Sequence, residues 1–185
     1  MRDQLLGAIQ PMLSILLDPG ESVIGEASRF AWMTDSIEMA VADETAVWVY
    51  TATGEPGTVA FAALRPGRII CVEVGPRDEG YLFRRSDFMA RTPGVQVRAD
   101  PAEYGLRRWR IGGCGQAWVE LAGDVVRREL TAGQSLRARP EHVGMFNGTI
   151  ALQVTQVHGT PSYLCAVLSG PGVVWLQSMP SAAEQ

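Results

Sequence analysis

The chain has 185 residues, 46% of them apolar, which is enough material for a domain with a hydrophobic core. Its 20 glycines and 11 prolines are spread along the sequence, as in proteins built from many short strands, so we expect an all-β protein. The net charge of −4 argues against nucleic acid as a partner. No segment of the sequence reaches the roughly 18 continuous apolar residues that a membrane-spanning helix needs. We expect a cytoplasmic location.

The N-terminal third predicts strands and turns. Residues 5–17 alternate loosely around Pro11, which predicts two strands with a break between them. Residues 18–21 contain a Pro-Gly pair that fits the centre of a tight turn. No helical period is sustained over 22–39, and the β-branched and aromatic residues of 47–53 are typical of a strand.

The middle of the chain contains one segment that is apolar at nearly every position and one that suits a helical turn. The apolar segment is 69–74, which predicts a central strand covered on both faces. The helical turn is expected within 81–90, and an alternating strand over 95–99. Over 106–111 a period of two residues places arginine on both faces of a strand.

The C-terminal half continues with short strands. Residues 117–121 and 125–130 predict strands, and the Gly-Asp pair between them predicts a hairpin connection. Further strands are predicted over 150–157, over 163–168 and after Gly172, and residues 181–185 are expected to form a loose tail.

A glycine followed by apolar or aromatic residues recurs at regular intervals. The glycines are Gly57, Gly115 and Gly172, which are 58 (115 − 57) and 57 (172 − 115) residues apart. A second phrase, Leu-x-x-Gly, begins at Leu17, Leu64 and Leu130, at uneven intervals of 47 (64 − 17) and 66 (130 − 64). We therefore predict one β domain over 1–180, built from three repeats of about 57 residues.

Each predicted repeat carries a large aromatic residue close to its glycine. These residues are Phe61, Trp118 and Trp175. Because aromatic side chains of this size contribute much of a hydrophobic core, we expect all three to occupy comparable places and to point inward.

Three phrases, in order along the chain, resemble a known family. They are Leu17-Asp-Pro-Gly-Glu-Ser22, Ser86-Asp-Phe-Met-Ala-Arg-Thr-Pro-Gly-Val95 and Leu168-Ser-Gly-Pro-Gly-Val-Val-Trp-Leu-Gln-Ser178. They resemble the altered-inheritance-of-mitochondria protein twenty-four family, and the last phrase is the most specific. The resemblance implies a double-stranded β-helix or β-sandwich-like barrel, related in fold to the tryptophan RNA-binding attenuation protein. It also implies a family whose bacterial members lack an assigned activity and whose eukaryotic members are associated with inner-membrane organisation.

The chain departs from that family in two segments. Where family members often carry glycine-rich apolar loops, residues 38–57 and 101–112 hold charged and aromatic side chains. The resemblance supplies no catalytic residues, and we predict none.

Metal ligands are scarce in this sequence. A cupin-type site needs two or three histidines and a carboxylate, whereas the chain has only His142 and His158, 16 residues apart (158 − 142), with Glu141 as the nearby acid. We predict no metal and no cofactor. The three cysteines, an odd number without paired spacing, are expected to be small core residues in a reducing compartment: Cys71, Cys114 and Cys165.

One basic and aromatic cluster stands out. Arg107, Arg108 and Arg110 surround Trp109, and such a set could stack on and neutralise a nucleotide or an anionic lipid headgroup. The competing interpretation is an edge strand that its charges protect against pairing with another sheet, and it is the one we favour.

The C-terminal part contains a long uncharged stretch. From His142 to Ala183 there are 42 residues (183 − 142 + 1) without an Asp, Glu, Lys or Arg. Charge depletion together with aromatic and methionine residues is typical of the core of a subunit interface. We therefore predict a closed homo-oligomer, a trimer or higher ring in preference to a dimer, with the contact at Val154, Leu164, Val174 and Trp175.

The leading functional hypothesis is a non-enzymatic β-domain that acts through homo-oligomeric assembly or through an unknown protein or membrane-surface partner. Two alternatives stay open. One is a cupin-like metalloenzyme for a small molecule, and the other is a module that binds an anion, a lipid headgroup or nucleic acid.

Overall fold

A computed structural model describes residues 1–42, 46–103, 106–156 and 164–180, and within 101–106 it describes no side chains. The described residues form 19 strands and three short 3-10 helices, and none of them lies in an α-helix. This confirms the prediction of an all-β protein. None of the described helices is long and apolar enough to cross a membrane. His158 and the predicted tail 181–185 lie outside the described residues.

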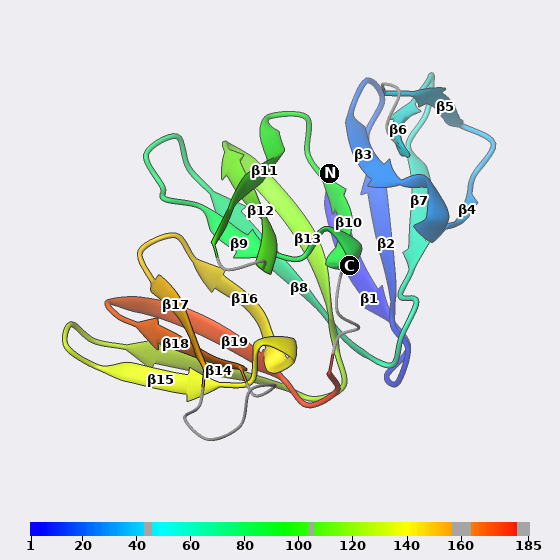
Figure 1. Ribbon diagram of the computed structural model, residues 1–185. Coiled ribbons are helices and arrows are strands. Elements are labelled where there is room, and N and C mark those ends of the chain that lie inside the picture. The colour runs from blue at the N-terminus through cyan, green and yellow to red at the C-terminus, as the bar shows by residue number, and fades with distance from the viewer. Residues whose placement is uncertain (43–45, 104–105, 157–163, 181–185) are drawn as a thin grey trace. The chain divides into compact units, whose positions relative to one another are not determined.

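The strands form four antiparallel sheets (Figure 1). The first has the order β1 (Arg2–Leu6), β2 (Met12–Leu17), β7 (Gly57–Ala62), β4 (Phe30–Met33). The second has the order β5 (Ile37–Val41), β6 (Val47–Ala52), β3 (Ser22–Glu26), β10 (Phe88–Arg91), β13 (Gly115–Ala122), β8 (Gly67–Val74). The third has the order β11 (Val95–Glu103), β12 (Leu106–Gly113), β9 (Tyr81–Phe83), β16 (Val143–Asn147), β19 (Gly172–Gln177), β14 (Val125–Leu130). The fourth has the order β15 (Ser135–Ala138), β18 (Leu164–Ser169), β17 (Ala151–Gln156).

The chain divides into two compact units. Unit 1 comprises Met1–Glu73, Asp87–Val95 and Cys114–Glu120, and unit 2 comprises Val74–Ser86, Gln96–Gly113 and Leu121–Gln185. A division into compact units does not show whether the two units unfold together or separately. The single domain over 1–180 therefore stays a prediction.

Each unit has its own hydrophobic core between two sheets. In unit 1, Leu13 and Phe61 of the first sheet pack in one buried cluster with Val23 and Trp118 of the second. The ring of Phe61 also fills the space beside Gly25, where a Cβ atom would collide with it. In unit 2 the corresponding cluster joins the third and fourth sheets, and its members include Leu82, Phe146, Val174, Ala166 and Leu168.

Three sets of elements follow one another in the same order. Each begins with a 3-10 helix, and these helices are η1 (Ala27–Arg29), η2 (Arg85–Asp87) and η3 (Pro140–His142). A strand follows each helix at once and pairs with a strand that begins at one of the recurring glycines, giving the pairs β4 with β7, β10 with β13 and β16 with β19. The register shifts once in each of the three pairs, as at a β-bulge. The helical turn predicted within 81–90 is η2.

The predicted burial of two segments needs correction. Residues 69–74 belong to β8, which is an edge strand whose residues alternate between buried and exposed, so it is not covered on both faces. That alternation leaves Cys71 exposed, Cys114 is exposed in a turn, and Cys165 is only half-buried. The cysteines are therefore not core residues.

The three aromatic residues near the recurring glycines have different surroundings. Phe61 and Trp118 are fully buried, as predicted. Trp175 is half-buried, with the Arg127 guanidinium 5.9 Å from its ring centre and the Tyr81 ring 5.8 Å away. The prediction that Trp175 points into the core is wrong, because its neighbour Val174 takes that place.

Candidate functional site

Unit 1 contains a group of ionic side chains inside its apolar interior. Arg29 from η1 is 2% exposed, and both Asp87 from η2 and Glu120 from β13 are fully buried. Burying a charge costs free energy unless the charge is paired and hydrogen-bonded, so these residues must stabilise one another. The sequence patterns gave no sign of them, because the three residues are far apart in the chain.

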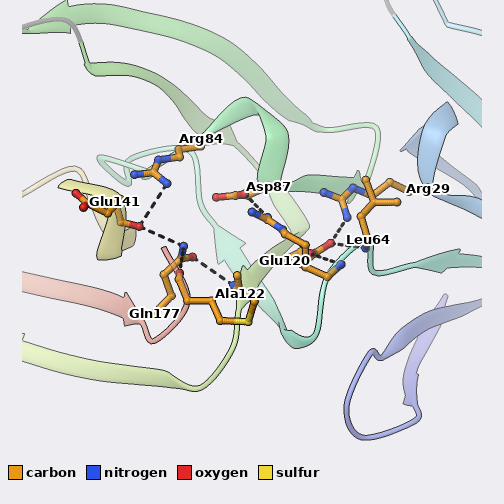
Figure 2. Close-up of polar contacts among 10 residues, drawn as sticks. Arg29, Leu64, Arg84, Asp87, Glu120, Ala122, Glu141 and Gln177 are labelled. Atoms are coloured by element: carbon orange, nitrogen blue, oxygen red, sulfur yellow. Dashed lines mark hydrogen bonds and ion pairs between the residues drawn. The ribbon is translucent and has the colours of Figure 1, made fainter. Parts of the chain in front are cut away.

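Glu120 is the centre of this group (Figure 2). Its carboxylate forms an ion pair with Arg29 and accepts hydrogen bonds from the backbone N–H of Leu64 at 2.9 Å and of Arg65 at 3.1 Å. Nε of Arg65 donates to the same carboxylate at 3.0 Å, and Nη2 of Arg65 donates to Asp87 at 2.6 Å. Burial alone would lower the pKa of Arg65, but the hydrogen bonds and charges of Asp87 and Glu120 outweigh it and raise that pKa.

A neutral group in unit 2 has a related arrangement (Figure 2). Gln177 of β19 is 2% exposed, and its Oε1 accepts from the backbone N–H of Ala122 at 3.3 Å. Its Nε2 donates to the carbonyl oxygens of Glu141 at 3.4 Å and Met179 at 2.9 Å. Nη2 of Arg84 donates to the carbonyl oxygen of Pro140 in η3 at 2.6 Å. Here a neutral amide bonds to the backbone much as the Glu120 carboxylate does in unit 1.

These contacts fit a structural role better than a catalytic one. A general base needs a carboxylate that can take up a proton from a substrate. Glu120 instead accepts from two arginines and two backbone amides, and no part of it is exposed. Arg65 is the most exposed member of the group, at 29%. The group therefore holds the turn after β7 in place against η1, η2 and β13.

The predicted arginine cluster is dispersed over both faces of β12. Arg107 is exposed, whereas Arg108 is 4% exposed with its guanidinium carbon 6.0 Å from the ring centre of Phe146. Trp109 is half-buried beneath Arg85, whose guanidinium carbon is 5.5 Å from the Trp109 ring centre.

The last residue of that cluster already has partners. Arg110 donates to Asp100 at 2.9 Å and to the carbonyl oxygen of Glu79 at 2.7 Å. The four residues thus do not share one surface. Since β12 lies between β11 and β9, the interpretation of this strand as a protected edge is wrong.

The four predicted interface residues differ in exposure. Leu164 is 46% exposed, and Val154 and Trp175 are half-buried. Val174 is fully buried in the core of unit 2, so it cannot belong to a surface. Its side chain belongs to the buried cluster that joins the third and fourth sheets, on a strand that is paired on both sides.

Metal ligands do not gather in the described part of the chain, where no group of three His, Cys, Asp or Glu side chains could hold an ion. Nδ1 of His142 lies 2.9 Å from the backbone carbonyl oxygen of Gln177. A polar recess of about 370 Å³ in unit 2, which sequence reasoning missed, is lined by Arg77, Asp78, Glu79, Gly80, Tyr81, Asn147 and Thr149.

Comparison with known proteins identifies the family. The family model described as Mitochondrial biogenesis AIM24 matches residues 4–179 of the chain. The chain belongs to this family. Among solved structures, the AIM24-family chain is similar to the crystal structure of a Streptococcus pyogenes protein, with 17% sequence identity and a TM-score of 0.82. That similarity covers 97% of this chain and 94% of the other, and it shows a shared fold. No curated protein matches the sequence.

Proposed function

We propose that this AIM24-family protein is a non-enzymatic module that acts by assembling into a homo-oligomer through the edge strand β17. The observation that carries the proposal is the distribution of charge over the sheet edges. Among the described strands, the four sheets have eight edges, and six of them hold at least one charged residue. The exceptions are β4 and β17.

An edge strand without charge is a template for pairing with another chain. Natural proteins normally protect such edges with charged residues, proline or a covering element. β17 has no charge and no proline over six residues, and its Ala151, Gln153 and Thr155 are exposed. It also lies within the 42-residue stretch (183 − 142 + 1) that lacks charged side chains. Pairing on this edge would extend the fourth sheet without burying an unpaired charge.

The existence of two different uncharged edges favours a ring. If β17 of one protomer pairs with β4 of the next, the contact is head-to-tail and can close into a ring. If β17 pairs with β17, the result is a dimer with two-fold symmetry. We expect the ring, because pairing between β4 and β17 would account for the lack of charged residues on both strands.

We also infer that the chain consists of three repeats wound as the predicted double-stranded β-helix. The three 3-10 helices begin 58 (85 − 27) and 55 (140 − 85) residues apart. The strand after each helix has the same kind of partner, and each pair has one register shift. These recurrences support the repeats.

The site geometry offers the rival functions less support. The buried carboxylates of unit 1 have structural partners, and of the arginines proposed to bind an anion Arg107 is exposed, Arg108 is buried and Arg110 is paired with Asp100. A cytoplasmic location and the identity of any further partner remain predictions.

Charge placed on β17 tests the assembly. We expect Gln153→Lys with Thr155→Lys to reduce the mass measured by light scattering towards the monomer mass of 20.0 kDa, because charged side chains on an edge strand oppose its pairing with another chain. Ala31→Lys on β4 should do the same if a ring forms, and should have no effect on a dimer made by β17 alone.

The matched control is Val126→Lys. Val126 is 45% exposed on β14, an edge strand that is already charged, so the mass should not change. A wild-type mass of 20.0 kDa would overturn the oligomer, and an oligomer that persists in the folded β17 double variant would overturn the location.

A further inference from the structure

Two neighbouring turns at one end of the first sheet expose aliphatic side chains. One turn joins β1 to β2 and the other joins β7 to β8, and both lie side by side in Figure 1. Ile9 is 77% exposed, Leu64 is 55%, Leu5 is 48% and Leu6 is 37%. We call these four residues the apolar tip. Ile9 has the largest exposed fraction among the large hydrophobic residues that the structure describes.

Hydrogen bonds fix the two turns to each other. The backbone N–H of Gly67 donates to the carbonyl oxygen of Ile9 at 2.9 Å, and Nε2 of Gln10 donates to that of Ala63 at 2.7 Å. The backbone N–H of Leu64 is held by the buried Glu120 at 2.9 Å. Because the backbone on both sides is anchored, the exposed side chains are held away from the core of unit 1.

The exposed acid nearest to the tip in the sequence is Asp3, two residues before Leu5, and an exposed cation, Arg68, follows the second turn. Residues 4–17 contain no charged residue, and the charged residues of 56–72 are Arg65 and Arg68 alone. Arg65 is paired with Asp87 and Glu120, which leaves Arg68 as the exposed positive charge beside the tip. An apolar surface next to an exposed cation is complementary to a layer of acyl chains beneath anionic headgroups.

We propose that the apolar tip inserts into the interfacial region of an anionic lipid bilayer. Ile9 and Leu64 lie in the two turns, and Leu5 and Leu6 are the last residues of β1, so the four side chains lie close to one end of the first sheet. A stable protein interface needs about 800 Å² on each partner. Exposed aliphatic side chains at the end of a sheet can enter the boundary between headgroups and acyl chains, roughly 5–10 Å deep, while Arg68 stays among the headgroups. This inference does not depend on assembly through β17.

Co-sedimentation with vesicles tests the insertion, using the full chain and vesicles of phosphatidylcholine alone or mixed with phosphatidylglycerol. Wild-type protein should sediment with the mixed vesicles and far less with phosphatidylcholine. Ile9→Asp with Leu64→Asp should weaken binding to the mixed vesicles by roughly tenfold or more, since two aliphatic groups can no longer leave water. Arg68→Gln should reduce the preference for the anionic lipid.

Val41→Asp is the matched control. Val41 is 65% exposed on β5, also in unit 1 but outside the tip, so binding should stay at the wild-type value. All these positions are exposed, and unchanged unfolding midpoints verify that the variants fold. The proposal would be overturned if the wild-type protein bound neither kind of vesicle, or if the double change at the tip left binding unaffected. It would also be overturned if Val41→Asp weakened vesicle binding as much as the double change does. If the wild-type protein does not bind vesicles and a tip variant changes the oligomer mass, the tip contacts protein and not lipid.

Discussion

Tyr50 is a buried polar group without a compensating hydrogen bond. It is fully buried, and among the described residues its hydroxyl has no hydrogen-bond partner. Its ring stacks on Phe30 with centres 5.6 Å apart and meets Phe61 edge-on at 5.3 Å. Desolvation by burial raises the pKa of Tyr50 from 10.0 to about 12, since the phenolate would have to exist in an apolar environment.

We predict that Tyr50→Phe makes the protein less sensitive to alkaline pH. The unfolded tyrosine ionises near pH 10 and the folded one near 12, so its contribution to stability is complete below pH 10 and is lost as the pH rises through that interval. At about pH 11 the variant should avoid a loss of about 1 kcal/mol. At neutral pH its free energy of unfolding should lie within about 1 kcal/mol of wild type, because no hydrogen bond is removed.

Urea titrations of both proteins at the two pH values measure this difference. Cys71 is exposed, but partial desolvation of its thiol and the charges of Asp3 and Glu73 raise its pKa to about 11; it is present in both proteins, so its effect cancels in the comparison. An alkaline loss of the same size in Tyr50→Phe would contradict the account.

At the residue scale, the position of an aromatic residue after a recurring glycine predicted its burial only where side chains from other strands cover its ring. Trp118 and Trp175 each lie three residues after a recurring glycine, yet Trp118 is fully buried and Trp175 is not. The difference depends on which side chains from other strands cover each ring. The buried position of Arg108 beside Phe146 could not be predicted for the same reason.

At the scale of elements, the structure explains why the Leu-x-x-Gly phrase recurred unevenly. Leu17 ends β2 and Leu130 ends β14, but Leu64 lies after the end of β7. The element that corresponds to β2 and β14 is β8, which ends at Val74. Its distances to Leu17 and Leu130 are 57 (74 − 17) and 56 (130 − 74) residues, close to the proposed repeat. The phrase at Leu64 does not mark a repeat, because Pro-Gly turns arise wherever a chain reverses direction.

Glu120 and Gln177 correspond in the proposed repeats, each five residues after its glycine (120 − 115 and 177 − 172). We predict that Glu120→Gln lowers the free energy of unfolding by about 3–5 kcal/mol. Leu64, Arg65 and Arg29 all donate to the Glu120 carboxylate, so a new amide NH₂ would face donors, and the carboxylate that forms an ion pair with the buried Arg29 would be lost.

Urea unfolding of Glu120→Gln should be compared with that of Glu129→Gln. Glu129 is 71% exposed and lies 3.6 Å from Arg127, a surface pair whose loss should change stability by less than about 1 kcal/mol. Equal stabilities of the two variants would show that the buried group does not hold unit 1 together.

At the scale of the whole molecule, the sequence predicted the class but not the order of the strands. Short alternating runs and frequent turns identify β-strands locally. Pairing is non-local, as when β2 pairs with β7 and β14 with β19. The Gly123-Asp124 connection illustrates the limit: it joins β13 to β14 with two residues, but the strands lie in different sheets, so the predicted hairpin is wrong. The edges that matter for assembly became visible only with the sheet order.

Backbone amide hydrogen exchange over 151–156 tests the proposed assembly most directly. Among the described strands β17 pairs with β18 alone, so in an isolated protomer its outward amides have no partner strand. We predict slow exchange at both sets of amides in the wild-type protein, while the charged edge strand β1 exchanges rapidly at its outward amides. Rapid exchange at the outward amides of β17 at high protein concentration would contradict the account.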